Sequence, residues 1–137
     1  MRIKAILSHL ALGMVVAIIV AGCAGLQAQS TSKIIMPLTD KKTAFDMTLS
    51  AATNAGMTVV SSDYEGGLIV AVSPGNPFLT FRNPTINIVL QSSSDGATTI
   101  SLSGITHGQL FDYGIAGDAL EKLCSGIKAQ APMAVCT

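Results

Sequence analysis

The chain of 137 residues has little of what nucleic-acid-binding proteins and metal-dependent enzymes require. It contains no tryptophan, two histidines and three cysteines, and charged side chains make up only 12% of it. Six basic and eight acidic residues follow residue 22, which gives that part of the chain a net charge of about −2. Because binding to nucleic acid needs a clustered positive surface, this balance argues against it. The length is enough for a single domain with one modest core.

The sequence also lacks the motifs of common catalytic sites. The nucleophile pattern Gly-x-Ser-x-Gly does not occur, and no glycine-rich stretch follows a strand in the order that phosphate-binding loops need. His107 is the only histidine after residue 22, and no nucleophile or orienting acid stands at a recognisable spacing from it. We therefore expect a protein that is not an enzyme and holds neither a cofactor nor a metal, with an enzyme as the less favoured alternative.

The N-terminal segment has the pattern of a secretory signal peptide. Arg2 and Lys4 give it a positive start, Leu10–Val20 is an uninterrupted apolar run, and the small residues Ala21–Gly22 follow. These three features together characterise such peptides, so we expect residues 1–22 to be removed. A transmembrane anchor is the alternative, although the apolar run is short for a span of about 20 residues.

The four residues Val20-Ala21-Gly22-Cys23 resemble the lipobox of bacterial lipoproteins, with valine in place of the usual leucine. The resemblance implies cleavage between Gly22 and Cys23 and attachment of a diacylglyceryl group, with further acyl chains such as palmitate, to the cysteine. Several acyl chains hold a protein stably on a membrane, whereas a single chain is marginal. Ala24, in place of an aspartate after the cysteine, implies sorting to the outer membrane with the domain in the periplasm.

The stretch that follows the lipobox, Ala24–Ser32, is small and polar and shows no apolar pattern. Such a composition is typical of a flexible linker, which would span about 30 Å when fully extended. We therefore expect residues 23–32 to form a lipidated tether and residues 33–137 to form a single domain.

Two cysteines remain beyond the lipobox, Cys124 and Cys136. An even pair in an oxidising compartment indicates a disulfide, and the chain-entropy model assigns roughly 3 kcal/mol to a closed loop of this size. Two free thiols, or a zinc site that includes His107, are the alternatives. These three residues show none of the short paired spacing that is usual for zinc ligands.

Apolar periodicity predicts two amphipathic helices in the domain. The first is expected over Asp40–Ala55, with Thr39 as its N-cap and Asp40 in its first turn. The second begins at Phe111 or Gly114 and ends at Lys128. Alternating or β-rich runs predict strands over Lys33–Leu38, Met57–Ser61, Leu68–Ser73, Thr85–Gln91 and Ala97–Ser103, a loop over Gly104–Gly108, and a short strand or extended loop over Phe78–Arg82.

This order of elements predicts an α+β domain of two layers, in which an antiparallel sheet of about four to six strands carries two helices on one face. The pattern resembles the helix-grip arrangement and is similar to domains of a lipoprotein subunit of the β-barrel assembly machinery. The stretch Ala55–Ala71, a helix exit followed by a hairpin, is similar to that of small envelope lipoproteins. The resemblance bears on the fold more than on the function.

The run Leu68–Ser73 is apolar on both faces of its strand. Leu68 and the residues two and four positions after it are expected to face the helices, so the alternate residues should point away from them. A few aliphatic side chains among threonines and serines make this second face a candidate surface for a partner or a ligand, with scattered surface residues as the alternative. The residues expected on this face are Val60, Ile69, Ala71 and Val89.

The favoured function is that of a small, non-catalytic lipoprotein, tethered to a bacterial membrane, that binds protein or other components of the envelope. The alternative is binding of a small apolar ligand between the sheet and the helices, which a cavity on the order of several hundred Å³ would favour. No nucleic-acid partner is expected.

Replacement of Cys23 tests the lipobox. Because the thioether forms on the cysteine sulfur, Cys23→Ser should leave the precursor uncleaved by lipoprotein signal peptidase and unlabelled by a clickable palmitate analogue. Labelling of cells that express each form, followed by immunoprecipitation, measures both outcomes. Equal labelling of variant and wild type would contradict the lipobox interpretation.

Overall fold

The computed structural model describes residues 27–74, 83–107 and 114–137. The predicted signal peptide, Cys23, Phe78–Arg82 and the earlier predicted start of the second helix, Phe111, lie outside these ranges. Within them the chain forms β1 (Gln27–Met36), α2 (Lys41–Asn54), β2 (Thr58–Asp63), β3 (Leu68–Val72), β4 (Thr85–Ser92), β5 (Thr98–His107), α3 (Ile115–Gln130) and β6 (Val135–Cys136).

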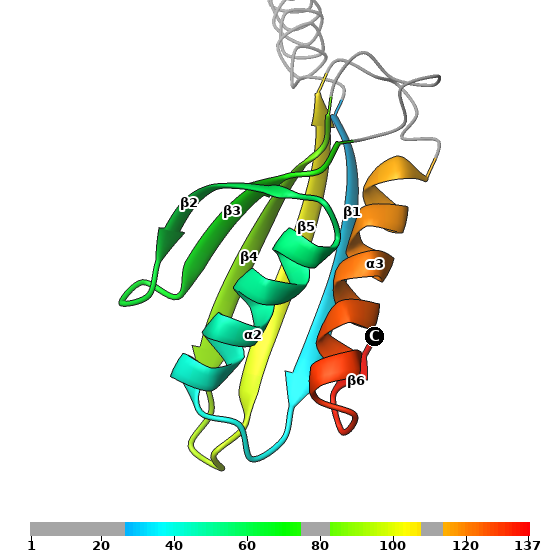
Figure 1. Ribbon diagram of the computed structural model, residues 1–137. Coiled ribbons are helices and arrows are strands. Elements are labelled where there is room, and N and C mark those ends of the chain that lie inside the picture. The colour runs from blue at the N-terminus through cyan, green and yellow to red at the C-terminus, as the bar shows by residue number, and fades with distance from the viewer. Residues whose placement is uncertain (1–26, 75–82, 108–113) are drawn as a thin grey trace, which may run out of the picture.

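The strands form one antiparallel sheet in the order β2-β3-β4-β5-β1-β6. Both helices lie across the same face of this sheet, next to each other (Figure 1). The first strand of the chain thus lies between two strands that come late in the sequence. The prediction of a two-layer α+β domain with two helices on one face is confirmed, and β6, which is only two residues long, was not predicted.

The prediction of a tether up to Ser32 is wrong for its second half. Residues from Gln27 onward belong to β1, which pairs with β5 along its whole length, from Gln27 opposite His107 to Met36 opposite Thr98. The predicted loop Gly104–Gly108 is correspondingly wrong for residues 104–107, because they are the strand that β1 pairs with. The domain therefore starts at least six residues earlier than the apolar pattern indicates.

Small residues explain why this part of the sheet shows no apolar pattern. Gly104 lies directly under α3, where a Cβ atom on it would come within 2.9 Å of the Cβ of Ala116. On β1 the positions facing the helices here are Ser30 and Ser32, four and two residues before the buried Ile34. The start of α3 approaches the sheet too closely for large apolar side chains, so both strands look like linkers in the sequence.

The first helix begins one residue later than predicted. Asp40, not Thr39, is the N-cap of α2, and its carboxylate accepts hydrogen bonds from the N–H and the hydroxyl of Thr43 at 3.0 and 2.7 Å. The hydroxyl bond, followed by the N–H bond, holds the pKa of Asp40 below its usual value. Thr39 instead donates its hydroxyl to the carbonyl of Pro37.

The core lies between the helices and one face of the sheet. The strand residues on this face alternate and are almost completely buried: Ile34, Met36, Ile69, Ala71, Ile86, Ile88, Leu90, Ile100 and Leu102. The predicted orientation of β3 is therefore wrong, since Ile69 and Ala71 have no exposed surface while Leu68 is 39% exposed. Pairing explains the reversal, because Ile69 lies opposite Ile88 and Ala71 opposite Ile86, both core residues of β4.

Charge substitution at adjacent residues of β3 tests this orientation. Ile69→Asp places a carboxylate in the filled core and should lower the free energy of unfolding by about 4 kcal/mol. Val70→Asp, one residue along, places the same group on the other face and should cost about 1 kcal/mol. Urea unfolding followed by circular dichroism measures both, and equal losses, or a larger loss at Val70, would contradict the assignment.

Candidate functional site

The face of the sheet opposite the helices is not covered by either of them (Figure 1). We call it the open face, and define it by the strand residues that alternate with those of the core. These residues are Gln29, Thr31, Lys33, Ile35, Thr58, Ser61, Asp63, Leu68, Val70, Val72, Thr85, Asn87, Val89, Gln91, Thr99, Ser101, Ser103, Ile105 and Val135.

A shallow groove of about 530 Å³ lies on the open face where β1, β4 and β5 meet the C-terminus. Several hydroxyl groups and one amide surround a valine side chain in this groove, and a lysine contributes an ammonium group. A hydrogen bond of 2.9 Å from the amide of Gln29 to the hydroxyl of Ser103 joins β1 and β5 just beside it. The residues that line the groove are Thr31, Ser32, Lys33, Asn87, Val89, Ser101, Leu102, Ser103 and Thr137.

The open face carries very little charge. Among the described residues that its strands contribute, Lys33 on β1 and Asp63 at the end of β2, opposite Leu68, are the charged ones. Asp63 sits at the β2–β3 turn, where its carboxylate lies against Gly66. The centre of the face therefore offers hydrogen-bonding groups and aliphatic carbon with no cluster of titratable groups.

The structure separates the four residues predicted to form an interaction face. Val89 lies on the open face and is partly buried. Val60 is 64% exposed and sits at an irregularity in the β2–β3 pairing, on the edge strand. Ile69 and Ala71 belong to the core, so their assignment to this face is wrong, and the residues of β3 on the open face are Leu68, Val70 and Val72.

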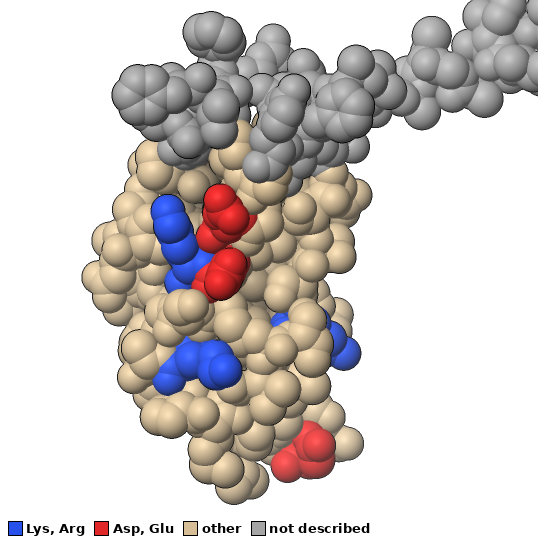
Figure 2. Space-filling view, turned by 90° about the vertical axis from the view of Figure 1, so that its right-hand side faces the viewer, with Lys and Arg blue, Asp and Glu red and all other residues tan. Residues whose placement is uncertain are grey.

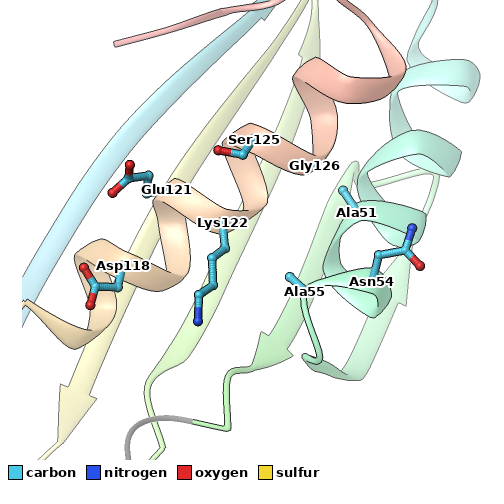
Figure 3. Close-up of a pocket in the computed structure, with 8 residues that line it drawn as sticks. All are labelled: Ala51, Asn54, Ala55, Asp118, Glu121, Lys122, Ser125 and Gly126. Carbon is cyan, nitrogen blue, oxygen red and sulfur yellow. The ribbon is translucent and has the colours of Figure 1, made fainter.

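A second groove, of about 630 Å³, lies between α2 and α3. Asn54 and Ala55 line it from α2, and Lys122 from α3 extends into the space between the helices (Figure 3). Asp118, Glu121 and Ser125 of α3 also line this groove (Figure 3). On the surface that includes α3, acidic and basic side chains are interspersed (Figure 2), as is usual for a solvated helix surface.

The space between the sheet and the helices is filled by side chains. Ile34, Ile88 and Ile100 from the sheet and Leu123 and Ile127 from α3 have no exposed surface. The grooves described above lie elsewhere, on the open face and between the outer sides of the helices. Neither of these grooves lies between the sheet and the helices, where a cavity would favour binding of an apolar ligand.

Within the described parts of the chain, no three His, Cys, Asp or Glu side chains lie close enough together to hold a metal ion. In the same parts, neither helix has the length and apolar content needed to cross a membrane. His107 ends β5 opposite Gln27, rather than lying in a loop as predicted. No protein-family model matches the chain, and no curated protein matches it in sequence.

The predicted disulfide is present between Cys124 on α3 and Cys136 on β6, with 6.4 Å between the two Cα atoms. The other side of the C-terminal segment is bonded to β1, where Lys33 and Thr137 exchange two backbone hydrogen bonds of 2.8 Å. The two-residue strand β6 is thus held from both sides, by a covalent bond to the helix layer and by pairing in the sheet.

Removal of the disulfide should destabilise the domain. The double variant Cys124→Ser/Cys136→Ser and the reduced wild type should each lose about 3 kcal/mol of unfolding free energy. Without the bond the unfolded chain can adopt more conformations, which lowers the free energy of the unfolded state. Urea unfolding with and without dithiothreitol measures the loss. Dithiothreitol should leave the double variant unchanged, and a wild type that is also unchanged by it would contradict the prediction.

Proposed function

We propose that the chain is the precursor of a small lipoprotein of the bacterial envelope, whose domain binds a protein or another envelope component and has no catalytic role. In this proposal Cys23 carries the lipid, residues 1–22 are removed, and the domain faces the periplasm from the outer membrane. Cys124 and Cys136 form the disulfide that such a compartment permits.

The anchor is supported by sequence and by redox chemistry together. Val20–Cys23 resembles a lipobox that directly follows an apolar run of signal-peptide length. The Cys124–Cys136 disulfide independently favours an oxidising compartment, which the periplasm provides.

The observation that carries the binding function is the open face of the sheet. Burying it against a partner would cost little, because its centre has hydroxyls and an amide, whose bonds to water a partner can replace, and hardly any charge to desolvate. Valines at positions 70, 72 and 89 add apolar area to be removed from water. This mixture of aliphatic and uncharged polar groups is suited to a protein–protein interface.

Site-specific photocrosslinking in cells tests the proposal. A benzophenone amino acid at Ser101, exposed on the open face, should give a discrete adduct with an envelope component after irradiation. The same group at Ser125, equally exposed on α3, is the matched control and should give none. Mass spectrometry of the purified adduct identifies the component.

A substitution that introduces a charge at the centre of the open face provides a second test. Val89→Glu should abolish the Ser101 adduct while lowering the free energy of unfolding by only about 1 kcal/mol, as expected for Val70→Asp, because both side chains are on the side of the sheet away from the helices. Adducts of equal yield from Ser101 and Ser125, or an adduct that survives Val89→Glu, would contradict binding through the open face.

A further inference from the structure

The first half of β1 has a neighbouring strand on only one of its two sides. β6 pairs with Ile34 and Ile35, and Lys33 exchanges two backbone hydrogen bonds of 2.8 Å with Thr137. In Figure 1 β6 lies beside the lower end of β1, away from the point where β1 starts. Along residues 27–32, the described part of the chain supplies no strand on the side of β1 that faces away from β5. We call this side of residues 27–32 the free edge.

The pairing of Lys33 shows where the backbone groups of the free edge point. In a strand the N–H and C=O of one residue point to the same side, and those of the next residue point to the other side. Both groups of Lys33 point away from β5, since they bond to Thr137. The same therefore holds for Thr31, Gln29 and Gln27, which precede it at steps of two. The free edge thus presents a regular row of donors and acceptors, and the side chains of Gln29 and Thr31 beside it are exposed.

The free edge lacks the features with which proteins usually block the addition of a strand. At the edges formed by β2 and β6, the register is irregular in β2, which ends in Asp63, and β6 is only two residues long. Residues 27–32 contain no charged residue and no proline, and they pair with β5 without a shift of register. A regular, uncharged strand edge is a template for a further strand.

The free edge is complementary to a second copy of itself. In an antiparallel pair centred on Gln29, this residue lies opposite its counterpart, and Gln27 lies opposite Thr31. Every outward N–H and C=O of both edges then has a partner, which gives about six backbone hydrogen bonds. The pairing stops short of Lys33, where Thr137 already occupies the position beside β1. Because residues 27–32 carry no charge, the two copies bring no like charges opposite each other.

We propose that two copies of the chain associate through the free edge, with their β1 strands antiparallel about a two-fold axis at Gln29. Such an interface uses the same surface of both copies, as two-fold symmetry requires. The two sheets become one continuous sheet, with both helix layers on one side and both open faces on the other. The proposal goes beyond the proposed function and does not depend on the lipid, because the pairing uses backbone groups of the folded domain.

Single cysteines at two positions of the free edge test the pairing. Opposite residues of a hydrogen-bonded antiparallel pair have Cα atoms about 5.5 Å apart, within the range that a disulfide spans. Gln29→Cys should therefore give a disulfide-linked dimer when cells that make the full chain are oxidised with copper phenanthroline. Thr31→Cys is the matched control. Its side chain is equally exposed on the same face, but its two copies would lie about 14 Å apart, too far for a disulfide.

Non-reducing gel electrophoresis measures the dimer, and two differently tagged copies made together show whether both chains are this protein. The dimer yield from Gln29→Cys should exceed the yields from Thr31→Cys and from the wild type by at least about tenfold. Equal yields from the two positions, or no dimer from Gln29→Cys, would overturn the proposal. An adduct of Gln29→Cys with a different protein, and none between the tagged copies, would overturn the second copy as the partner.

Proline substitutions test the direction of the backbone groups. Thr31→Pro removes an N–H that points away from β5, so the urea midpoint should change little while the Gln29→Cys dimer falls about tenfold. Ser32→Pro, one residue along, removes an N–H that bonds to β5 and should lower the midpoint strongly. A dimer yield that Thr31→Pro does not change would overturn the pairing. Equal destabilisation by the two prolines would show that the N–H of Thr31 already has a partner within the domain, which would also overturn the proposal.

Discussion

The pairing of β1 with β5 is the interaction on which the rest of the domain depends. It joins the first described strand to one that lies about seventy residues later, through ten consecutive residue pairs. β6 has no other neighbour in the described sheet, and α3 packs across both β1 and β5. Closing so long a stretch of chain costs entropy that only the completed sheet and its helix layer offset. Without β1, β5 would become an edge strand and β6 would have no strand to pair with.

The same pairing brings the proposed anchor and the fold together. β1 begins at Gln27, four residues after Cys23, and lies between β5 and β6 in the sheet, so it is part of the folded domain. A long linker would let the domain turn freely and present every surface to the periplasm. With the proposed lipid on Cys23, a connection of four residues between Cys23 and Gln27 would limit the orientations of the domain relative to the membrane.

Sequence patterns predicted those elements in which periodicity and burial agree. The apolar periodicity that predicted α2 places Phe45 and Thr48 in the core, and the alternation that predicted β4 places Ile86, Ile88 and Leu90 there. Elsewhere the pattern is ambiguous for physical reasons. The five residues of β3 are apolar on both faces, so only pairing with β4 determines that Ile69 is in the core. The part of the sheet under α3 is built from small residues, which removed the apolar signal from β1 and β5. The open face could be anticipated as a surface, but not which residues of β3 belong to it.

The edges of the sheet give a reason to look for a partner on its face. An edge strand with free N–H and C=O groups can accept a further strand, and proteins often prevent this by bulges, charges or short edges. β2 has an irregular register between Val59 and Ser61 and ends in Asp63, while β6 is two residues long and bonded to α3 through Cys136. The Gln27–Thr31 part of β1 has no second neighbour among the described strands, and it lies at the end nearest Cys23. Strand addition is thus hindered at both β2 and β6, whereas the open face presents mostly uncharged groups across four strands. Recognition through the face therefore requires less rearrangement of the domain than recognition through either edge strand.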